Sequence, residues 1–293
     1  MTQILVRHKV DNLDSLPMLP TVAQQILSLS GNPDSMPKDL AAIVKIDPSL
    51  SAQIIRQANS AFYGFRGKVD SVEMAIIQVL GYDWTLSLAL VISTLNVLEL
   101  PSKGPLGILA FWKRAVSCAL VTEKLARSCP ADKNVSPALS YLSGLIHDIG
   151  YLILCHICPR EYRTLNEAIE KQQNESALSV ERSMLDMDHL EIGGLVLEHW
   201  SMPGPIVVAA REHSQLGYTG PHQEYAKIVS LAHLLLENMD STSLSEIALP
   251  DEIINALQIS KSSIETVFFD LVEKQGELDD LAHQLATNSI TRH

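Results

Sequence analysis

Apolar positions recur along this chain with the three- to four-residue spacing of amphipathic helices. Such stripes cover 111–126, 137–155, 162–169, 189–200, 206–213 and 225–239. Two further amphipathic helices are expected in the last ~40 residues. No stretch alternates convincingly with the period of two that marks a half-buried strand. The pattern therefore predicts an all-α fold.

Several helix boundaries can be predicted from their capping residues. Asp47 is a good N-cap and is followed by Pro48, whose missing N–H is harmless at the first helical position. Asp70 and Glu73 have the spacing of a capping box in which aspartate replaces serine or threonine. Gly81 is placed to end the helix that they begin.

A proline- and glycine-rich segment interrupts the helical pattern about one third of the way along the chain. This segment is PSKGPLG at 101–107. A chain of 293 residues can bury a substantial core and can form either one large domain or two lobes. We expect a smaller N-terminal helical lobe in residues 1–103 and a second helical lobe in residues 104–293.

Composition and charge narrow the classes of function. The chain has 22 Lys and Arg against 34 Asp and Glu, a net charge of −12, and no local basic patch, which argues against nucleic-acid binding. The uncharged stretch 84–98 is shorter than the ~20 residues of a membrane helix, and the N-terminal residues lack the apolar region of a signal peptide. Four cysteines do not predict a disulfide scaffold. We expect a cytoplasmic protein that binds neither nucleic acid nor a membrane.

The stretch GLIHDIGYLIL at 144–154 places His147 and Asp148 within a strongly apolar segment. If 137–155 is one helix, Gly144 and Gly150 share a face with His147, although a glycine inside a helix costs about 0.5–1 kcal/mol. Their presence suggests that another helix or a ligand approaches closely. Imidazole nitrogen and carboxylate oxygen together suit Mn, Fe or Zn. The alternative is a hydrogen-bonded histidine beside a capping or ion-paired aspartate.

Several separated motifs carry a resemblance to one family. They are DPSL, ANSAFYG, AIIQVLG, HDIG and EHWSMP, spread over roughly residues 13–240. Together they resemble the HDOD (HD-related output domain) family, a divergent branch of the HD/HD-GYP superfamily of metal-dependent phosphohydrolases. The resemblance implies an HD-domain-like bundle of many helices, with residues 104–293 as the HD-like lobe. Members are bacterial and mostly regarded as non-catalytic signalling domains.

The chain departs from the superfamily's metal-ligand pattern. That pattern has a histidine on an earlier helix, the His-Asp pair and a later aspartate. Arg114 stands where the first histidine is expected, His233 where the aspartate is expected, and Tyr151 where a lysine often follows HDIG. An arginine cannot ligate a metal, because its guanidinium has no accessible lone pair. The resemblance therefore implies a degenerate site in which His147 and Asp148 are vestigial.

Arg114 lies on an apolar helix face, where a cation is rare unless it is paired. We hypothesise that its guanidinium occupies the place of a metal and forms a salt bridge with Asp148. The alternative is an arginine at the helix edge, with its stem packed and its head in water.

His189 and His213 also lie on apolar faces and are further pocket candidates, together with Arg114 and His233. They can line a metal or phosphate pocket, or they can be core histidines that are hydrogen-bonded to backbone carbonyls. The second interpretation is the commoner one, and we favour it for both.

These observations favour a non-catalytic signalling module that acts through a protein partner or a small phosphate-containing ligand and needs no cofactor. The alternative is a metal-dependent phosphohydrolase acting on a phosphate ester or a cyclic dinucleotide. That enzyme would need Mn, Fe or Zn on an unorthodox ligand set: His147, Asp148, His189 and His213. The sequence leaves open whether the protein is an enzyme, and the altered ligands weigh against it.

Overall fold

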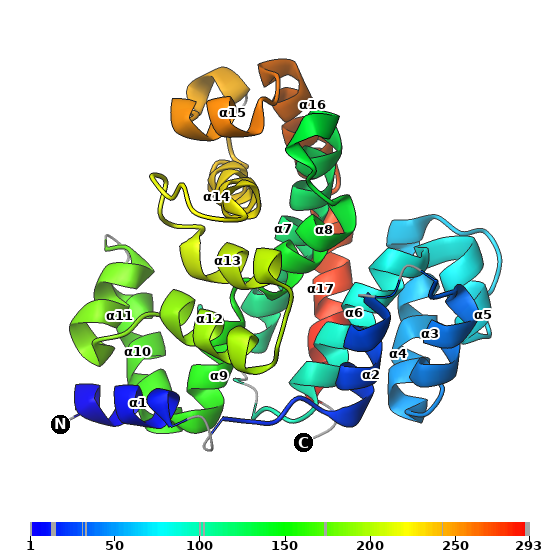
Figure 1. Ribbon diagram of the computed structural model, residues 1–293, viewed down its shortest axis with the longest axis horizontal. Coiled ribbons are helices and arrows are strands. Elements are labelled where there is room, and N and C mark those ends of the chain that lie inside the picture. The colour runs from blue at the N-terminus through cyan, green and yellow to red at the C-terminus, as the bar shows by residue number, and fades with distance from the viewer. Residues whose placement is uncertain are drawn as a thin grey trace.

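A computed structural model describes residues 2–12, 16–30, 32, 34–99, 101, 103–172, 175–241 and 243–290. Throughout these residues the regular structure is helical, so the predicted all-α fold is confirmed (Figure 1). The helices are α1 Thr2–Asp11, α2 Thr21–Ser30, α3 Pro37–Val44, α4 Pro48–Ala58, η2 Ala61–Tyr63, α5 Val72–Met74, η3 Ala75–Leu80, α6 Tyr82–Leu95, α7 Ile108–Ser128, η4 Ala131–Lys133, α8 Pro137–Ile146, α9 Ile149–Ile157, α10 Pro159–Lys171, α11 Ala177–Leu185, α12 His189–His199, α13 Gly204–Glu212, α14 Gln223–Glu237, η5 Leu244–Glu246, α15 Asp251–Leu257, α16 Lys261–Glu273 and α17 Gln275–Ile290.

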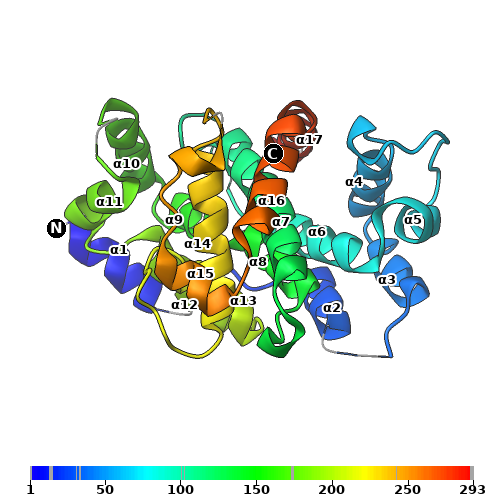
Figure 2. The same cartoon turned by 90° about the horizontal axis from the view of Figure 1, so that it is seen from above.

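Helices α2 to α6 form a group at one end of the molecule (Figure 2). Asp47 caps α4 as predicted: one carboxylate oxygen accepts from the backbone N–H of Ser49 at 2.8 Å, and Pro48 is the first helical residue. The predicted capping box at Asp70 is wrong by one residue. The cap is Ser71, because the helix begins at Val72 and Ser71 has the extended backbone of an N-cap (φ −136°, ψ 154°), with its hydroxyl accepting from the N–H of Met74.

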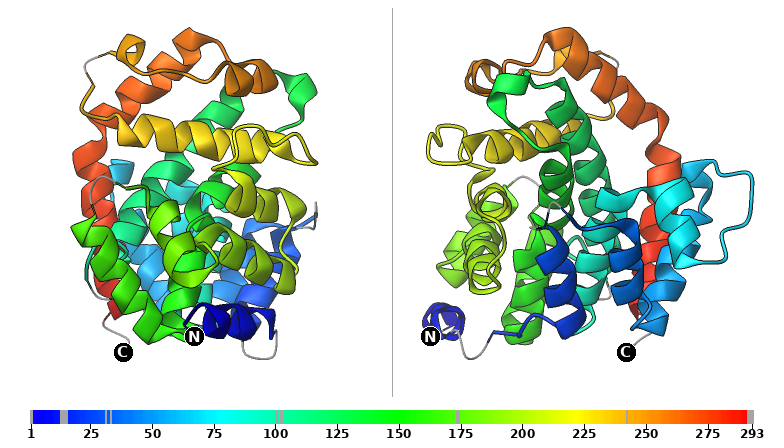
Figure 3. Two further views of the ribbon diagram at one scale, coloured as in Figure 1. Left: turned by 90° about the vertical axis from the view of Figure 1, so that its left-hand side faces the viewer. Right: turned by 45° about the vertical axis from the view of Figure 1, so that its right-hand side comes forward.

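Helices α7 and α8 pack along each other at the centre of the molecule, and α14 lies across both (Figure 3). Gly144 permits the close crossing of α8 and α7, since a Cβ atom there would lie 2.7 Å from the backbone of Ala119. Gly150 does the same where α9 meets α12: its Cβ would lie 1.9 Å from the carbonyl oxygen of His189. Close contact between helices therefore explains the two glycines.

The predicted single helix over 137–155 is broken at the His-Asp pair. Helix α8 ends at Ile146 and α9 begins at Ile149, so His147 and Asp148 lie in a turn between them. Asp148 leaves the helical region at φ −90° and ψ 12°, and the N–H of Tyr151 then bonds to its carbonyl at 3.1 Å. This local turn lets the two side chains point to one side instead of about 100° apart, as they would on a continuous helix.

The stretch Pro137–Ile157 is also, among the described residues, the one whose length and apolar composition would allow it to cross a membrane. However, 83% of its most apolar window is buried inside the protein. Its hydrophobic character is thus accounted for by its place in the core.

The two ends of the chain both cross the predicted boundary between lobes. Helix α1 packs against α11, and α17 packs against α7 on one side and α4 on the other. Within the segment 101–107, Ser102 lies outside the described residues. The division into lobes 1–103 and 104–293 stays a prediction.

Candidate metal centre and cleft

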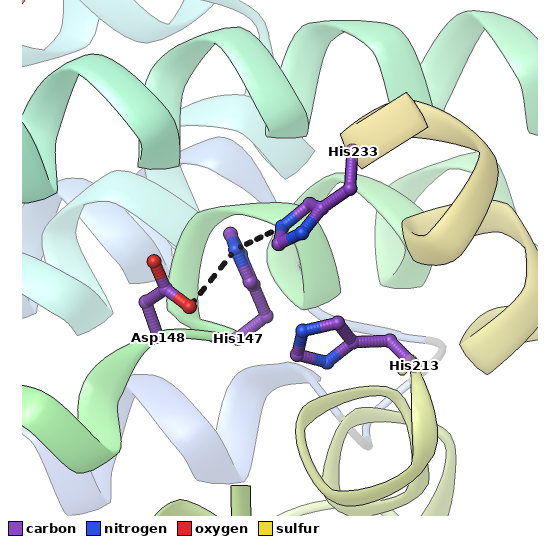
Figure 4. Close-up of side chains that lie close together, drawn as sticks. All are labelled: His147, Asp148, His213 and His233. Atoms are coloured by element: carbon purple, nitrogen blue, oxygen red, sulfur yellow. Dashed lines mark hydrogen bonds and ion pairs between the residues drawn. The ribbon is translucent and has the colours of Figure 1, made fainter. Parts of the chain in front are cut away.

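Four side chains from three separate parts of the fold converge beside the α8–α9 turn (Figure 4). His147 and Asp148 come from the turn itself, His213 from the residue that ends α13, and His233 from the middle of α14. One nitrogen or oxygen atom of each lies within 4.8 Å of the others. The sequence places these residues far apart, and helix packing brings them together.

Backbone hydrogen bonds fix the orientation of two of these imidazoles. Nδ1 of His147 donates to the carbonyl of Gly144 at 2.8 Å, and Nδ1 of His213 donates to the carbonyl of Ala209 at 2.8 Å. A carbonyl can only accept, so each Nδ1 carries the proton and each Nε2 presents a lone pair. Nε2 of His147 in turn lies 2.7 Å from Nε2 of His233.

Burial keeps the three imidazoles neutral. It lowers the pKa of His147, lowers that of His213 to about 3 and lowers that of His233 well below its usual value. Burial alone would raise the pKa of Asp148, but His147, Arg114 and His189 outweigh it and hold this pKa well below its usual range.

Three neutral imidazoles and one carboxylate form a donor set that suits Zn, Fe or Mn. Nε2 of His147 and Nε2 of His213 can bind a cation without losing a proton, whereas Nε2 of His233 donates its proton to His147 and would have to release it to bind through that atom. The residues His147, Asp148, His213 and His233 therefore fit one divalent metal ion, and we call them the metal centre.

Arg114 binds the carboxylate of Asp148 from outside this set. Its Nε donates to Oδ2 of Asp148 at 2.6 Å, and one terminal nitrogen donates to the carbonyl of Pro105 at 3.2 Å. The other terminal nitrogen is buried and has no hydrogen-bond partner. The hypothesised salt bridge is therefore present. Because the arginine uses Oδ2, Oδ1 of Asp148 still faces Nε2 of His147 at 3.3 Å.

His189 is held by carboxylates, whereas the sequence favoured backbone carbonyls as its partners. Its Nδ1 lies 2.8 Å from Oε2 of Glu181, and its Nε2 lies 3.5 Å from Oδ1 of Asp148. Burial alone would lower the pKa of His189, but these two carboxylates raise it to about 9. The ring is also stacked on Tyr151 at 4.0 Å. His189 therefore lies beside the metal centre, and the third imidazole of the centre belongs to His233.

Sequence reasoning missed Glu181, a carboxylate that is only 1% exposed. It accepts from the hydroxyl of Tyr151 at 2.5 Å and from the backbone N–H of His189 at 2.7 Å. A signal existed: Glu181 stands one residue after Val180 and four before Leu185, on the buried face of α11. A charge on an apolar stripe indicates a buried partner.

A cavity of about 540 Å³ opens above these groups. Arg114, Asp148, Tyr151, His189, His213 and His233 form its floor. The walls are mostly apolar and come from the ends and faces of several helices. They consist of Leu106, Ile169, Ser176, Ala177, Leu178, Ser214, Leu216, Ser230, Leu234, Glu237, Pro250 and Ile253.

Comparisons with known proteins place this geometry in context. The family described as HDOD domain matches residues 16–216. A protein of Treponema pallidum (strain Nichols), described as uncharacterized, is 25% identical over 231 residues, which are 78% of this chain and 43% of that protein.

Two solved structures share the fold. One, from Marinobacter aquaeolei VT8 and provisionally named a signal transduction protein, has a TM-score of 0.84 at 29% identity, covering 94% of this chain and 60% of that one. The other, from Shewanella amazonensis SB2B and provisionally named a phosphohydrolase, has a TM-score of 0.73 at 21% identity, covering 97% and 98%. The chain thus spans less than two thirds of the Treponema and Marinobacter proteins.

Proposed function

This chain belongs to the HDOD domain family, and from that premise we propose that it is a cytoplasmic signalling module which binds a ligand and a protein partner without hydrolysing a phosphate ester. The name of the Marinobacter relative supports a role in signalling. The net charge of −12 argues against nucleic acid as the partner.

One observation carries the proposal: Arg114 is bound to Asp148. A metal-dependent hydrolase needs a group that orients water and accepts its proton, besides the groups that hold the metal. Asp148 is the one carboxylate of the metal centre: Oδ2 accepts from Arg114, and Oδ1, which lies 3.5 Å from Nε2 of His189, is the oxygen that remains to hold the metal. No oxygen of Asp148 is left for that second task.

The neighbouring groups do not replace it. Both ring nitrogens of His189 face carboxylate oxygens, so neither presents a lone pair to the cavity. Glu181 is occupied by Tyr151 and His189, and Glu237 is an exposed residue of the cavity wall. Among the described residues that line the cavity outside the metal centre, none is a buried and free general base.

A single divalent ion, Zn, Mn or Fe, fits this proposal. His147, Asp148, His213 and His233 would hold it, and it would supply a Lewis-acidic positive charge at the bottom of the cavity. The same donor set favours the second candidate function, a metal-dependent phosphohydrolase acting on a phosphate ester or a cyclic dinucleotide.

Hydrolysis assays separate the two functions. The full chain, loaded in turn with Zn²⁺, Mn²⁺ and Fe²⁺, is incubated with bis(p-nitrophenyl) phosphate, p-nitrophenyl phosphate and cyclic di-GMP. We expect product release no faster than that of a His147→Ala, Asp148→Ala double variant under the same conditions. Metal-dependent turnover that disappears in the double variant would establish the phosphohydrolase instead.

A further inference from the structure

The cavity above the metal centre has two chemically different parts. Its floor carries every charged or imidazole side chain of the lining except Glu237. Its walls carry six aliphatic side chains from four helices and two loops: Leu106, Ile169, Leu178, Leu216, Leu234 and Ile253. A volume of about 540 Å³ lies within the range of ~300–1,000 Å³ that small-molecule sites occupy.

The charges of the floor cancel in pairs. Arg114 is matched by Asp148, and His189 is matched by Glu181 behind it. A divalent ion in the metal centre would therefore supply the unbalanced positive charge. Arg114 is a lining residue of the cavity, and its side chain is 33% exposed.

We propose that this cavity binds an aliphatic compound that carries one anionic group, either a carboxylate or a phosphate monoester. The anionic group lies on the floor beside Arg114, and the aliphatic part lies against the six wall side chains. This inference rests on the proposed function, because the metal ion supplies the charge that the anionic group neutralises.

The walls do not suit a nucleotide. Nucleobases are recognised by stacking on aromatic rings and by hydrogen bonds to their edges. The walls contain no aromatic ring, and the ring of Tyr151 on the floor is already stacked on His189. Their uncharged polar groups are the hydroxyls of three serines, and no other Lys or Arg joins Arg114 to receive a second phosphate.

Part of this wall lies beyond the family match. The HDOD match ends at residue 216, whereas Leu234 and Ile253 belong to α14 and α15. The apolar wall that selects an aliphatic ligand is thus supplied in part by sequence outside the family's common region. Leu216, which is 44% exposed, is a wall residue that can be substituted with little effect on the core.

The test measures binding of defined probes to the full chain by titration calorimetry, with and without Zn²⁺. The probes are decanoate and decyl phosphate, with hexanoate, decanol and AMP as comparisons. We expect at least one of the two ten-carbon anions to bind the zinc-loaded protein, and the tighter one identifies the anionic group. Hexanoate should bind far more weakly than decanoate, by about four-fold for each buried methylene that it lacks.

Three variants locate the site. Arg114→Gln should weaken binding of the ten-carbon anion by about ten-fold or more. Leu216→Glu should weaken binding of the ten-carbon anion at least five-fold, because it places a negative charge on an apolar wall. Ile77→Glu, at a 67% exposed position on η3, is the matched control and should leave the affinity unchanged.

Several results would overturn the inference: binding of neither ten-carbon anion, decanol binding as tightly as decanoate, AMP binding more tightly than both anions, or equal affinities in Leu216→Glu and Ile77→Glu. If Arg114→Gln does not fold, the comparison of Leu216→Glu with Ile77→Glu and the series of probes still test the inference. Turnover of a phosphate ester would refute the proposed function while leaving tight anion binding intact. Absence of both binding and turnover would refute this inference alone.

Discussion

Nε of Arg114 donates to Oδ2 of Asp148 at 2.6 Å, while Oδ1 of the same carboxylate faces Nε2 of His147 at 3.3 Å. One carboxylate is therefore shared between a fixed cation and a cluster of neutral imidazoles. The four side chains of the metal centre still converge in the presence of Arg114. However, the arginine places a positive charge beside them and occupies Oδ2, one of the two oxygens of the carboxylate in the metal centre.

Replacing Arg114 by glutamine should strengthen metal binding. The substitution removes a positive charge that repels a divalent ion and frees Oδ2 of Asp148. We expect the dissociation constant for Zn²⁺ or Mn²⁺ to fall by about ten-fold, which corresponds to about 1.4 kcal/mol. Competition titration with a chromogenic chelator measures this constant.

The adjacent residue offers a matched control for that variant. Lys113 is on the same helix but pairs with Asp279 at 2.9 Å, away from the cavity lining. Lys113→Gln should change the metal affinity little, because exposed charges are screened by water and salt. Equal effects of the two substitutions would mean that the charge of Arg114 has no special influence on the metal centre.

Alanine substitutions should distinguish a histidine that binds the metal ion from one that only lies beside the metal centre. His233→Ala removes a donor atom and should abolish stoichiometric binding of Zn, Mn or Fe. His189→Ala removes a residue that only orients Asp148, so the metal should stay bound with an affinity reduced by about 10- to 100-fold. Metal content by elemental mass spectrometry measures the first effect and chelator competition the second. Loss of metal from His189→Ala with retention in His233→Ala would reverse the assignment.

A methyl group at Gly150 should be costly. The added Cβ of Gly150→Ala would lie 1.9 Å from the carbonyl oxygen of His189, so α9 and α12 would have to move apart. We expect the free energy of unfolding to fall by at least about 2 kcal/mol in urea denaturation. Gly276→Ala is the matched control, because nothing lies within 4 Å of its added Cβ, and it should stabilise the protein by up to about 1 kcal/mol. Similar changes in both variants would contradict the close helix crossing.

The helical fold could be predicted because its signal is local. The apolar stripe at 206–213 and the Asp47–Pro48 start reappear as α13 and α4, since periodicity and capping depend on neighbouring residues. The break at His147 and Asp148 could not be predicted this way. The segment is apolar on both sides of the pair, and the turn depends on packing against α7 and α12.

The candidate site was only partly predictable, for a related reason. The apolar segment around them indicates His147 and Asp148, and the resemblance to one family adds Arg114 and His233. Which atoms face one another depends on how α7, α13 and α14 cross, and single-helix faces do not contain that information. His233 was therefore expected in a pocket but not among the metal ligands, and Glu181 was not expected at all.

Acid should weaken the contact between α16 and α7 through Asp270, which pairs with Lys124 and, at 3.2 Å, with Lys274. Burial alone would raise the pKa of the Asp270 carboxyl, but hydrogen bonds from the two lysines outweigh it and hold this pKa below its usual value. A carboxyl whose pKa is lower in the folded state stabilises the protein above its unfolded pKa of about 3.9, and this stabilisation is lost as the pH falls through the folded pKa.

Asp270→Asn should accordingly be less stable than the parent protein at pH 7 and equally stable once Asp270 is protonated in both states. The difference at pH 7 should be about 0.2–1 kcal/mol, since the pair is partly exposed to water. Urea denaturation from pH 7 down to about pH 3 measures how the difference closes. Asp279→Asn removes a more exposed partner, that of Lys113, and should show a smaller difference at every pH. A gap between Asp270→Asn and the parent protein that stays constant down to the lowest pH would show that the ion pairs of Asp270 do not contribute to stability.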